Sequence, residues 1–221
     1  MAERRVLCFG DSNTWGFVPV ASSPSSRFAR ELRWPHVMGA ALGPGVTVIE
    51  EALNGRTTDA PDPAHPLLGG AGLDGAAYLP AALASHLPLD VVVIMLGTND
   101  LKPHLARTPQ RIAQGAKRLL DIARTLDGGV GTAYPNPRLL LVCPPPPGAF
   151  SPDFAEMFAG AAEKARALPP LYEAVARAAG AAFLDAGTVI ATDGVDGVHL
   201  SADMQRRLGL AIADSVRPLL D

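Results

Sequence analysis

The chain has 221 residues, of which 48% are hydrophobic, and a formal net charge of −3. This length fits one α/β domain or at most two small ones, and no linker or charge block marks a second unit, so we expect a single domain over residues 1–221. The mild charge argues against nucleic acid or an anionic membrane as a partner. The amino terminus does not resemble a signal peptide and no stretch approaches 18 uninterrupted apolar residues, so we expect a soluble, cytoplasmic protein.

Five short apolar runs predict the strands of a buried sheet. Several are nearly continuous and rich in β-branched residues, which is typical of strands covered on both faces. Segments with helical spacing separate the runs, and this alternation predicts parallel strands joined by right-handed crossovers in a three-layer α/β/α sandwich. The runs lie at Val6–Phe9, Val46–Ile49, Val91–Leu96, Leu139–Cys143 and Ala181–Leu184.

Helix signals occur in the segments between the strands. Thr108 and Pro109 form the clearest helix start, because Thr caps helices and Pro favours their first turn, and an apolar face follows as far as Leu126. The other predicted helices cover about Pro35–Leu42, Pro152–Ala179 with an interruption near Pro169-Pro170, and the segment that follows the cap residue Ser201.

Two proline-rich stretches do not fit regular structure. The stretch Pro61–Pro80 is also rich in glycine, and we expect a long loop with a short helix after it. Pro144–Pro147 is a run of four prolines directly after the fourth predicted strand. Loops of this length in a compact domain are often functional or lie at interfaces, but the sequence leaves the roles of 61–80 and 144–148 open.

A polar turn follows the first predicted strand and presents Ser12. Gly10 allows a sharp turn, and Asp11, Ser12 and Asn13 can bond to nearby backbone and begin a helix. A serine hydroxyl at the carboxyl end of a central strand is well placed to attack a carbonyl carbon. Taken alone, the turn is equally typical of an ordinary strand end.

Near the other end of the chain, Asp196 and His199 lie three residues apart in a turn that contains Gly197. A short tether of this kind can bring a carboxylate to an imidazole, fix the tautomer of the ring and leave its other nitrogen to accept a serine proton. Asp193 is a competing carboxylate, and we prefer Asp196 because the shorter connection constrains the pair more.

Two further polar turns follow predicted strands. Gly97-Thr98-Asn99-Asp100 ends the strongest strand and places Asn99 at the same sheet edge as Ser12, where its side-chain N–H could stabilise an oxyanion. Asn54-Gly55 follows the second strand, and Gly55 can bring its backbone N–H close to a bound group.

Together, these four turns resemble, in order, the four signature blocks of the SGNH (GDSL) hydrolases. The resemblance spans nearly the whole chain. It implies a flavodoxin-like five-stranded parallel sheet with Ser12 as nucleophile, His199 as general base and then acid, and Asp196 as its orienting partner. The implied oxyanion hole consists of the Ser12 and Gly55 backbone N–H groups and the Asn99 side chain.

A narrower resemblance is to the aryl esterase/acyltransferase subgroup, which is known also for perhydrolysis. It is carried by Gly10–Gly16, Arg33-Trp34, Arg56–Thr58, Leu96–Asp100 and Asp193–His199. That subgroup can carry a small residue other than glycine where this chain has Gly55, so the rigidity of this loop and the pocket wall could differ. The subgroup also suggests a homo-oligomer, with an octamer as one such assembly.

We therefore expect a serine esterase that cleaves small acyl and aryl esters through an acyl-enzyme, with no cofactor and no metal. Because the reaction has two steps, an alcohol or hydrogen peroxide could replace water as the acyl acceptor. Alternatives with the same triad are a carbohydrate acetyl esterase and a lysophospholipase or thioesterase. A remoter alternative is a flavodoxin-like binding module without catalysis, with Asp11 as a phosphoacceptor or a loop that holds a mononucleotide.

Other residues allow only broader expectations. Asp11 and Thr98 are expected to contact substrate, whereas Trp15 either walls the acyl pocket or packs in the core. Lys102 either lines the mouth of the pocket or is a solvated charge, and we prefer the second. The segment Gly70–Gly75 has the spacing of a dinucleotide-binding fingerprint, but no clear strand precedes it, so we do not expect a cofactor there. Structural or surface positions are expected for His36, His65, His86 and His104, and buried, inert thiols for Cys8 and Cys143.

Overall fold

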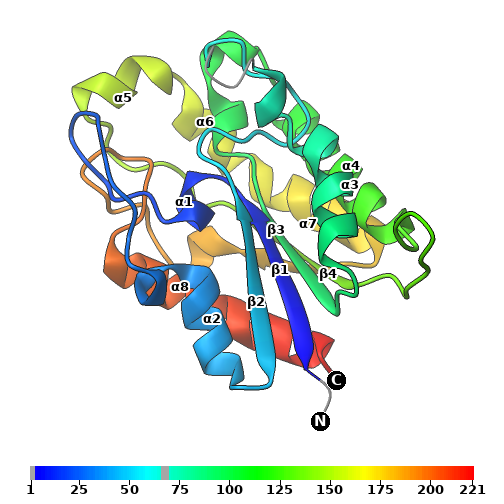
Figure 1. Cartoon of the computed structure of the whole chain (residues 1–221). Helices are drawn as coiled ribbons and strands as arrows, with labels where there is room; N and C mark the ends of the chain where they lie inside the picture. The colour runs from blue at the N-terminus through cyan, green and yellow to red at the C-terminus, as the bar shows by residue number, and fades with distance from the viewer. Residues whose placement is uncertain (1–2, 66–69) are drawn as a thin grey trace.

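The computed structural model describes residues 3–65 and 70–221. Its centre is a five-stranded parallel sheet with the strand order β2-β1-β3-β4-β5 (Figure 1). The strands are β1 (Arg4–Gly10), β2 (Val46–Ala52), β3 (Val91–Met95), β4 (Arg138–Cys143) and β5 (Ala182–Asp185). The predicted fold class and all five predicted strands are therefore confirmed.

Two strand boundaries differ from the predicted ones for identifiable reasons. β3 ends before Leu96, whose carbonyl accepts a hydrogen bond from the Tyr172 hydroxyl at 2.9 Å instead of a bond from a neighbouring strand. β5 begins after Ala181, whose N–H donates to the carbonyl of Ala176 at 2.9 Å and so completes the end of the preceding helix.

Helices cover both faces of the sheet, as Figure 1 shows. On one face, α2 (Trp34–Leu42) and α8 (Ala202–Val216) pack through Trp34, Met38, Leu208 and Ile212 onto the alternate strand residues Val6 and Val93. On the other face, α3 (Gly75–His86), α4 (Pro109–Thr125) and α7 (Leu168–Ala179) pack through Leu79, Ile112, Leu119 and Tyr172 onto Leu7 and Ile94. Strands with both faces covered explain the continuous apolar runs of the sequence.

Two predicted helix starts are confirmed at the level of the capping atoms. The Thr108 hydroxyl accepts the N–H of Arg111 at 3.3 Å at the start of α4, and the Ser201 hydroxyl accepts the N–H of Met204 at 3.3 Å at the start of α8. α2 begins at Trp34, one residue before Pro35.

The predicted helical stretch Pro152–Ala179 is confirmed, with one break more than expected. It forms three helices, α5 (Pro152–Met157), α6 (Ala161–Arg166) and α7, and the gap between α6 and α7, just before Pro169, is the predicted interruption. Pro169 lies in the first turn of α7, where a missing N–H costs nothing. The first break falls at Gly160, which has φ +75°, a left-handed conformation that disfavours residues with a side chain.

The prediction of a loop throughout Pro61–Pro80 was also wrong at its carboxyl end. Residues 66–69 lie outside the described part of the chain, but α3 already begins at Gly75 and includes Pro80. The Asp74 carboxylate accepts the N–H of Ala77 at 3.1 Å and caps this helix. Burial of Leu79 and Leu83 against the sheet outweighs the hydrogen bond that Pro80 removes.

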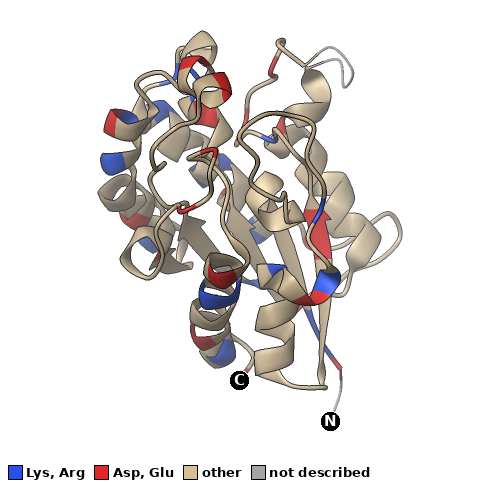
Figure 2. Ribbon diagram, turned by 90° about the vertical axis from the view of Figure 1, so that its left-hand side faces the viewer, with Lys and Arg blue, Asp and Glu red and all other residues tan. Residues whose placement is uncertain are grey.

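Because the strands are parallel, their carboxyl ends lie at one edge of the sheet, away from the two chain termini in Figure 1. Gly10 pairs with both Ala52 and Met95, so the loops after β1, β2 and β3 begin side by side. Figure 2 shows acidic and basic residues interspersed over the ribbon. Over the described ranges, no helix has the length and apolar character needed to cross a membrane.

Candidate active site

Ser12 begins the short helix α1 (Ser12–Trp15) at the carboxyl end of β1. The Asp11 carboxylate accepts the N–H of Asn13 at 3.0 Å and fixes the start of this turn. Gly10 is required by space, because a Cβ there would lie 2.6 Å from Cβ of Thr14 and 3.1 Å from the carbonyl oxygen of Met95. The close approach of β1 and α1 therefore presents Ser12 at the sheet edge.

His199 lies between Ser12 and Asp196. Its Nε2 is 2.9 Å from the Ser12 Oγ, and its Nδ1 is 2.9 Å from the Asp196 Oδ2. The three side chains are almost completely buried, with Ser12 6%, His199 5% and Asp196 0% exposed. An imidazole in this position can accept the serine proton while the carboxylate faces its other nitrogen.

The loop that carries the pair is held by the same carboxylate. The Asp196 Oδ1 accepts the N–H groups of Val198 and His199, each at 2.8 Å, and Gly197 takes φ +76° to make the turn. Burial alone raises the pKa of Asp196, but hydrogen bonds from the His199 ring and from these N–H groups outweigh it and lower the pKa below its usual value. Asp196 is therefore ionised at neutral pH.

Asp193, the competing carboxylate, lies elsewhere. Its Oδ1 accepts the N–H of Ser201 at 2.9 Å and its Oδ2 accepts the Ser201 hydroxyl at 2.6 Å. It thus anchors the start of α8, and the structure brings Asp196 to the His199 ring instead.

Asn13 joins the nucleophile turn to the histidine loop. Its Nδ2 donates to the carbonyl of Val198 at 3.2 Å, and its own carbonyl accepts the side-chain amide of Gln205 in α8 at 2.9 Å. The Gln205 side-chain oxygen also accepts the N–H of Trp34 at 2.9 Å. These buried bonds fix the separation of Ser12 and His199 across the sheet edge.

Three residues that line one cavity, Ser12, Gly55 and Asn99, each offer an N–H donor. Among the described residues, the backbone N–H groups of Ser12 and Gly55 have no hydrogen-bond acceptor, and Gly55 has φ +85°. One hydrogen of the Asn99 amide is held by the carbonyl of Arg56 at 3.1 Å, which leaves the other for a ligand. Preorganised donors of this kind can stabilise the negative oxygen of a tetrahedral intermediate.

The comparisons with known proteins agree with this geometry. The model of the GDSL-like lipase/acylhydrolase family matches residues 8–207. The chain belongs to this SGNH (GDSL) family.

Solved structures of high sequence identity indicate which kind of hydrolase this chain is. A carbohydrate acetylesterase from Sinorhizobium meliloti is 52% identical, with a TM-score of 0.94, and the match covers 98% of this chain and 100% of that one. An aryl esterase from M. smegmatis is 49% identical, with a TM-score of 0.94 and the same coverage of 98% and 100%. A comparison with curated proteins gave no match. This GDSL-family member is therefore a carboxylic ester hydrolase.

A cavity of about 160 Å³ opens at Ser12 in this hydrolase. One wall is aromatic, because the Phe17 ring stacks on the His199 ring with centroids 4.1 Å apart and the Phe154 ring meets it edge-on at 5.9 Å. Ser12, Asn99 and Gly55 line the same cavity, and the remaining lining residues are Ser23, Asn54, His65, Lys102, Met157, Phe158 and Val198.

Asp11 and Thr98, which were expected to contact substrate, and Trp15, one candidate for the pocket wall, are not among the lining residues of this cavity. Asp11 is 1% exposed and caps α1 beneath Ser12, and burial raises its pKa to about 6. The half-buried Trp15 ring lies under the Arg27 guanidinium, 4.7 Å from its centroid. Thr98 is buried next to Asn99.

The sequence did not reveal most of the pocket wall. Phe154, Met157 and Phe158 have the spacing of one helical face, which was the available signal for the apolar side. The preference for a solvated Lys102 was wrong, because the residue is only 2% exposed and, as in the other alternative, lines the cavity. Its burial depends on Asp62, which lies 3.0 Å from the ammonium and is distant in sequence.

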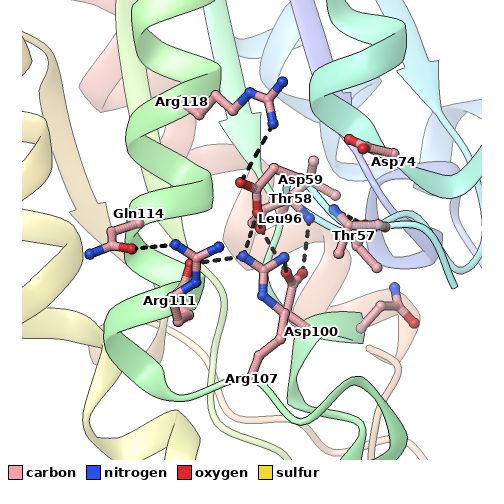
Figure 3. Close-up of polar contacts among 12 residues, drawn as sticks. Thr57, Thr58, Asp59, Asp74, Leu96, Asp100, Arg107, Arg111, Gln114 and Arg118 are labelled. Carbon is pink, nitrogen blue, oxygen red and sulfur yellow. Dashed lines mark hydrogen bonds and ion pairs between the residues drawn. The ribbon is translucent and has the colours of Figure 1, made fainter. Parts of the chain in front are cut away.

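A buried ion network joins the loops after β2 and β3 (Figure 3). The Asp100 carboxylate accepts the N–H and the hydroxyl of Thr58, at 2.9 and 2.6 Å, and lies 2.9 Å from Nη1 of Arg107. Arg107 also contacts Asp59. Because Asp100 follows Asn99 and Thr58 lies three residues after Gly55, the network fixes the two loops relative to each other.

No group of three or more His, Cys, Asp or Glu side chains in the described ranges is arranged to hold a metal ion. Cys8 and Cys143 are buried and unpaired, and burial raises the pKa of both thiols.

Proposed function

We propose that Ser12 is the nucleophile, that His199 is the general base and then the general acid, and that Asp196 orients His199. The Ser12 Oγ–H donates to His199 Nε2, so attack on an ester carbonyl transfers the serine proton to the imidazole. The facing Asp196 carboxylate stabilises the imidazolium that forms. The continuous chain of two 2.9 Å contacts from Asp196 through His199 to Ser12 carries this proposal.

The Ser12 and Gly55 backbone N–H groups and the Asn99 side-chain amide form the proposed oxyanion hole. Collapse of the tetrahedral intermediate expels the alcohol, which takes its proton from His199 Nε2. The acyl group remains on Ser12 until a second nucleophile attacks it. The absence of competing acceptors for the two backbone donors within the described ranges supports these assignments. Substrate contacts by Asp11, Trp15 and Thr98 stay a prediction.

We propose short acyl and aryl esters as substrates. Drug-sized ligands fill pockets of roughly 300–1,000 Å³, so a cavity of about 160 Å³ fits a short acyl group better than a long chain. The aromatic wall beside His199 favours an aryl leaving group. Acetylated carbohydrate is the second candidate, favoured by the 52% identity to a carbohydrate acetylesterase. A lysophospholipase or thioesterase that binds long chains fits the cavity least well.

We further propose acyl transfer to alcohols or hydrogen peroxide, because the acyl-enzyme can react with any small nucleophile that reaches it. The test is a panel of p-nitrophenyl acetate, phenyl acetate and an acetylated sugar, each with and without methanol or peroxide. Formation of methyl acetate or peracetic acid by the wild type but not by Ser12→Ala would support transfer. Acetic acid as the sole acyl product at every acceptor concentration would reject it.

A single catalytic domain over residues 1–221 and a homo-oligomeric assembly are also part of this proposal. The two apolar clusters lie on opposite faces of one sheet, which supports one domain. Light scattering tests the assembly, and a clean monomer would reject it. The cytoplasmic location stays a prediction.

A further inference from the structure

The pocket wall contains a buried ammonium group that the proposed mechanism does not use. The Lys102 side chain is 3% exposed, and its Nζ lies 3.0 Å from the Asp62 Oδ2 and 3.3 Å from the His65 Nε2. Lys102 and His65 both line the cavity at Ser12. A lysine is almost never fully buried unless it is paired, so its place in this wall requires an explanation.

The Lys102 ammonium is held by Asp62 and His65, and His104 in turn holds Asp62. The Asp62 carboxylate is fully buried, and its other oxygen accepts the N–H of Ala64 at 3.1 Å and contacts the His104 Nε2 at 2.8 Å. Burial raises the pKa of Asp62, but hydrogen bonds from His104 and Lys102 outweigh it and lower this pKa. Burial and the nearby Lys102 charge lower the pKa of His65, so its neutral ring can accept from the ammonium.

One donor of the ammonium is therefore left for a ligand. An ammonium has three N–H donors, and in the described ranges Asp62 and His65 account for two of them. The third has no protein acceptor within those ranges, although Lys102 lines the substrate cavity. A buried donor without a partner is costly, so a substrate that offers an acceptor gains relative to one that does not.

The position of Lys102 identifies which part of the ester it faces. The leaving alcohol must accept a proton from His199 Nε2, so it lies beside His199, Phe17 and Phe154. No contact joins Lys102 to the His199 ring within the described ranges; its Nζ contacts Asp62 and His65 and lies 6.0 Å from the Phe158 ring centroid.

His65 connects Lys102 to the residue that supplies one of the proposed oxyanion donors. A Cβ on Gly55 would lie 3.8 Å from the His65 Nε2, so the imidazole that contacts Lys102 lies beside the Gly55 donor. Because Lys102 is linked through His65 to Gly55 and not to the His199 ring, we assign it to the acyl side of the ester.

We propose that Lys102, held by Asp62 and His65, is a specificity-determining residue that selects short acyl groups carrying a hydrogen-bond acceptor, such as an alkoxy, hydroxy or oxo oxygen. This inference rests on the proposed function of Ser12. Sites that hydrogen-bond a substrate group discriminate strongly against analogues without it, because their own polar groups then stay unpaired. A merely structural role of Lys102, joining Asp62 to the turn after β3, predicts no such discrimination.

The test compares p-nitrophenyl methoxyacetate with p-nitrophenyl butyrate, which have the same leaving group and acyl chains of equal length. The ratio of their kcat/KM values is measured for the wild type, Lys102→Met and the control Lys117→Met, whose lysine is exposed on α4. The difference in intrinsic reactivity cancels when ratios are compared between variants. We expect the ratio to fall about tenfold in Lys102→Met, mainly through KM for methoxyacetate, and to stay unchanged in Lys117→Met.

Each other outcome is informative. If the wild type hydrolyses neither ester, the proposed function fails and this inference fails with it. If the wild type hydrolyses both but Lys102→Met lowers both equally, or neither, only this inference is overturned.

A second measurement on the wild type covers the case in which Lys102→Met does not fold. Methoxyacetamide and butyramide are compared as competitive inhibitors. The inference predicts tighter inhibition by methoxyacetamide, and equal or weaker inhibition would overturn it.

Discussion

His199 Nε2 lies 2.9 Å from Ser12 Oγ, although 187 positions separate the two residues in sequence. The parallel sheet creates this proximity, since β1 ends at Gly10, two residues before Ser12, and the loop that carries His199 crosses the same edge. Asn13 and Gln205 then fix the distance with buried hydrogen bonds. This arrangement predicts which substitutions lower kcat and which lower only the free energy of unfolding.

Replacing Asp196 by Asn tests the orienting carboxylate. The amide can present an N–H to the His199 Nδ1 and so favour the wrong tautomer, which lowers kcat by about 10⁴-fold in such triads. Steady-state hydrolysis of p-nitrophenyl acetate measures the effect. Asp193→Asn is the matched control, because Asp193 contacts Ser201 and not the ring. Equal losses of kcat in the two variants would contradict the assignment.

Replacing Asn99 by Ala tests the oxyanion hole. Removal of one preorganised donor lowers kcat by about 10²–10³-fold, with a much smaller change in KM. Asn136→Ala serves as the control, since Asn136 is exposed at the opposite end of the sheet. A rise in KM at constant kcat would instead mean that Asn99 only binds the ground state.

The pair of Asp100 and Arg107 gives a prediction about stability. Arg107→Met leaves a fully buried carboxylate without its cation and lowers the free energy of unfolding by about 3–5 kcal/mol. Arg118→Met, which removes an exposed arginine 3.9 Å from Asp59, costs less than about 1 kcal/mol.

A double-mutant cycle in urea completes this test. The free energy of unfolding of the double variant Asp100→Asn/Arg107→Met should fall by less than the sum of the decreases in the two single variants. Strict additivity would show that the two residues do not act as a pair.

Asp11 gives a pH-dependent prediction. Burial raises its pKa to about 6 in the folded state. Because the unfolded carboxyl has a pKa of about 4, Asp11 holds a proton between these values only when folded, and its contribution to stability falls as pH rises through this window, by at most about 3 kcal/mol.

Asp11→Asn isolates this effect. The amide oxygen can still accept the N–H of Asn13 but cannot ionise. At about pH 8 the variant should therefore have a higher free energy of unfolding than the wild type, by about 1–3 kcal/mol, and the advantage should shrink toward about pH 4. A difference that is constant with pH in urea titrations would rule this out.

The sequence was sufficient to predict the sheet and to nominate residues that the structure brings together. Continuous apolar runs are typical of doubly covered strands, and the carboxyl ends of parallel strands share an edge. Ser12, Asn99 and His199 could therefore be expected at one place from their positions along the chain. The capping residues Thr108 and Ser201 bond within one turn of their own helices, so the starts of these helices could also be predicted from the sequence.

The features that sequence analysis missed depend on contacts between distant segments. Lys102 is buried because Asp62 reaches it from another loop, and no local pattern encodes that contact. Pro80 suggested a loop, but the packing of Leu79 and Leu83 on the sheet maintains the helix. At both positions, contacts between distant segments decide the structure, against what the local sequence suggests.

The most direct test of the central claim is the reaction of the folded wild type with the organophosphate paraoxon, followed by peptide mass mapping. The account predicts one diethyl phosphate adduct, on Ser12, formed in step with loss of esterase activity and much more slowly in His199→Ala. Loss of activity with the adduct on another residue, or full labelling of Ser12 without loss of activity, would contradict it.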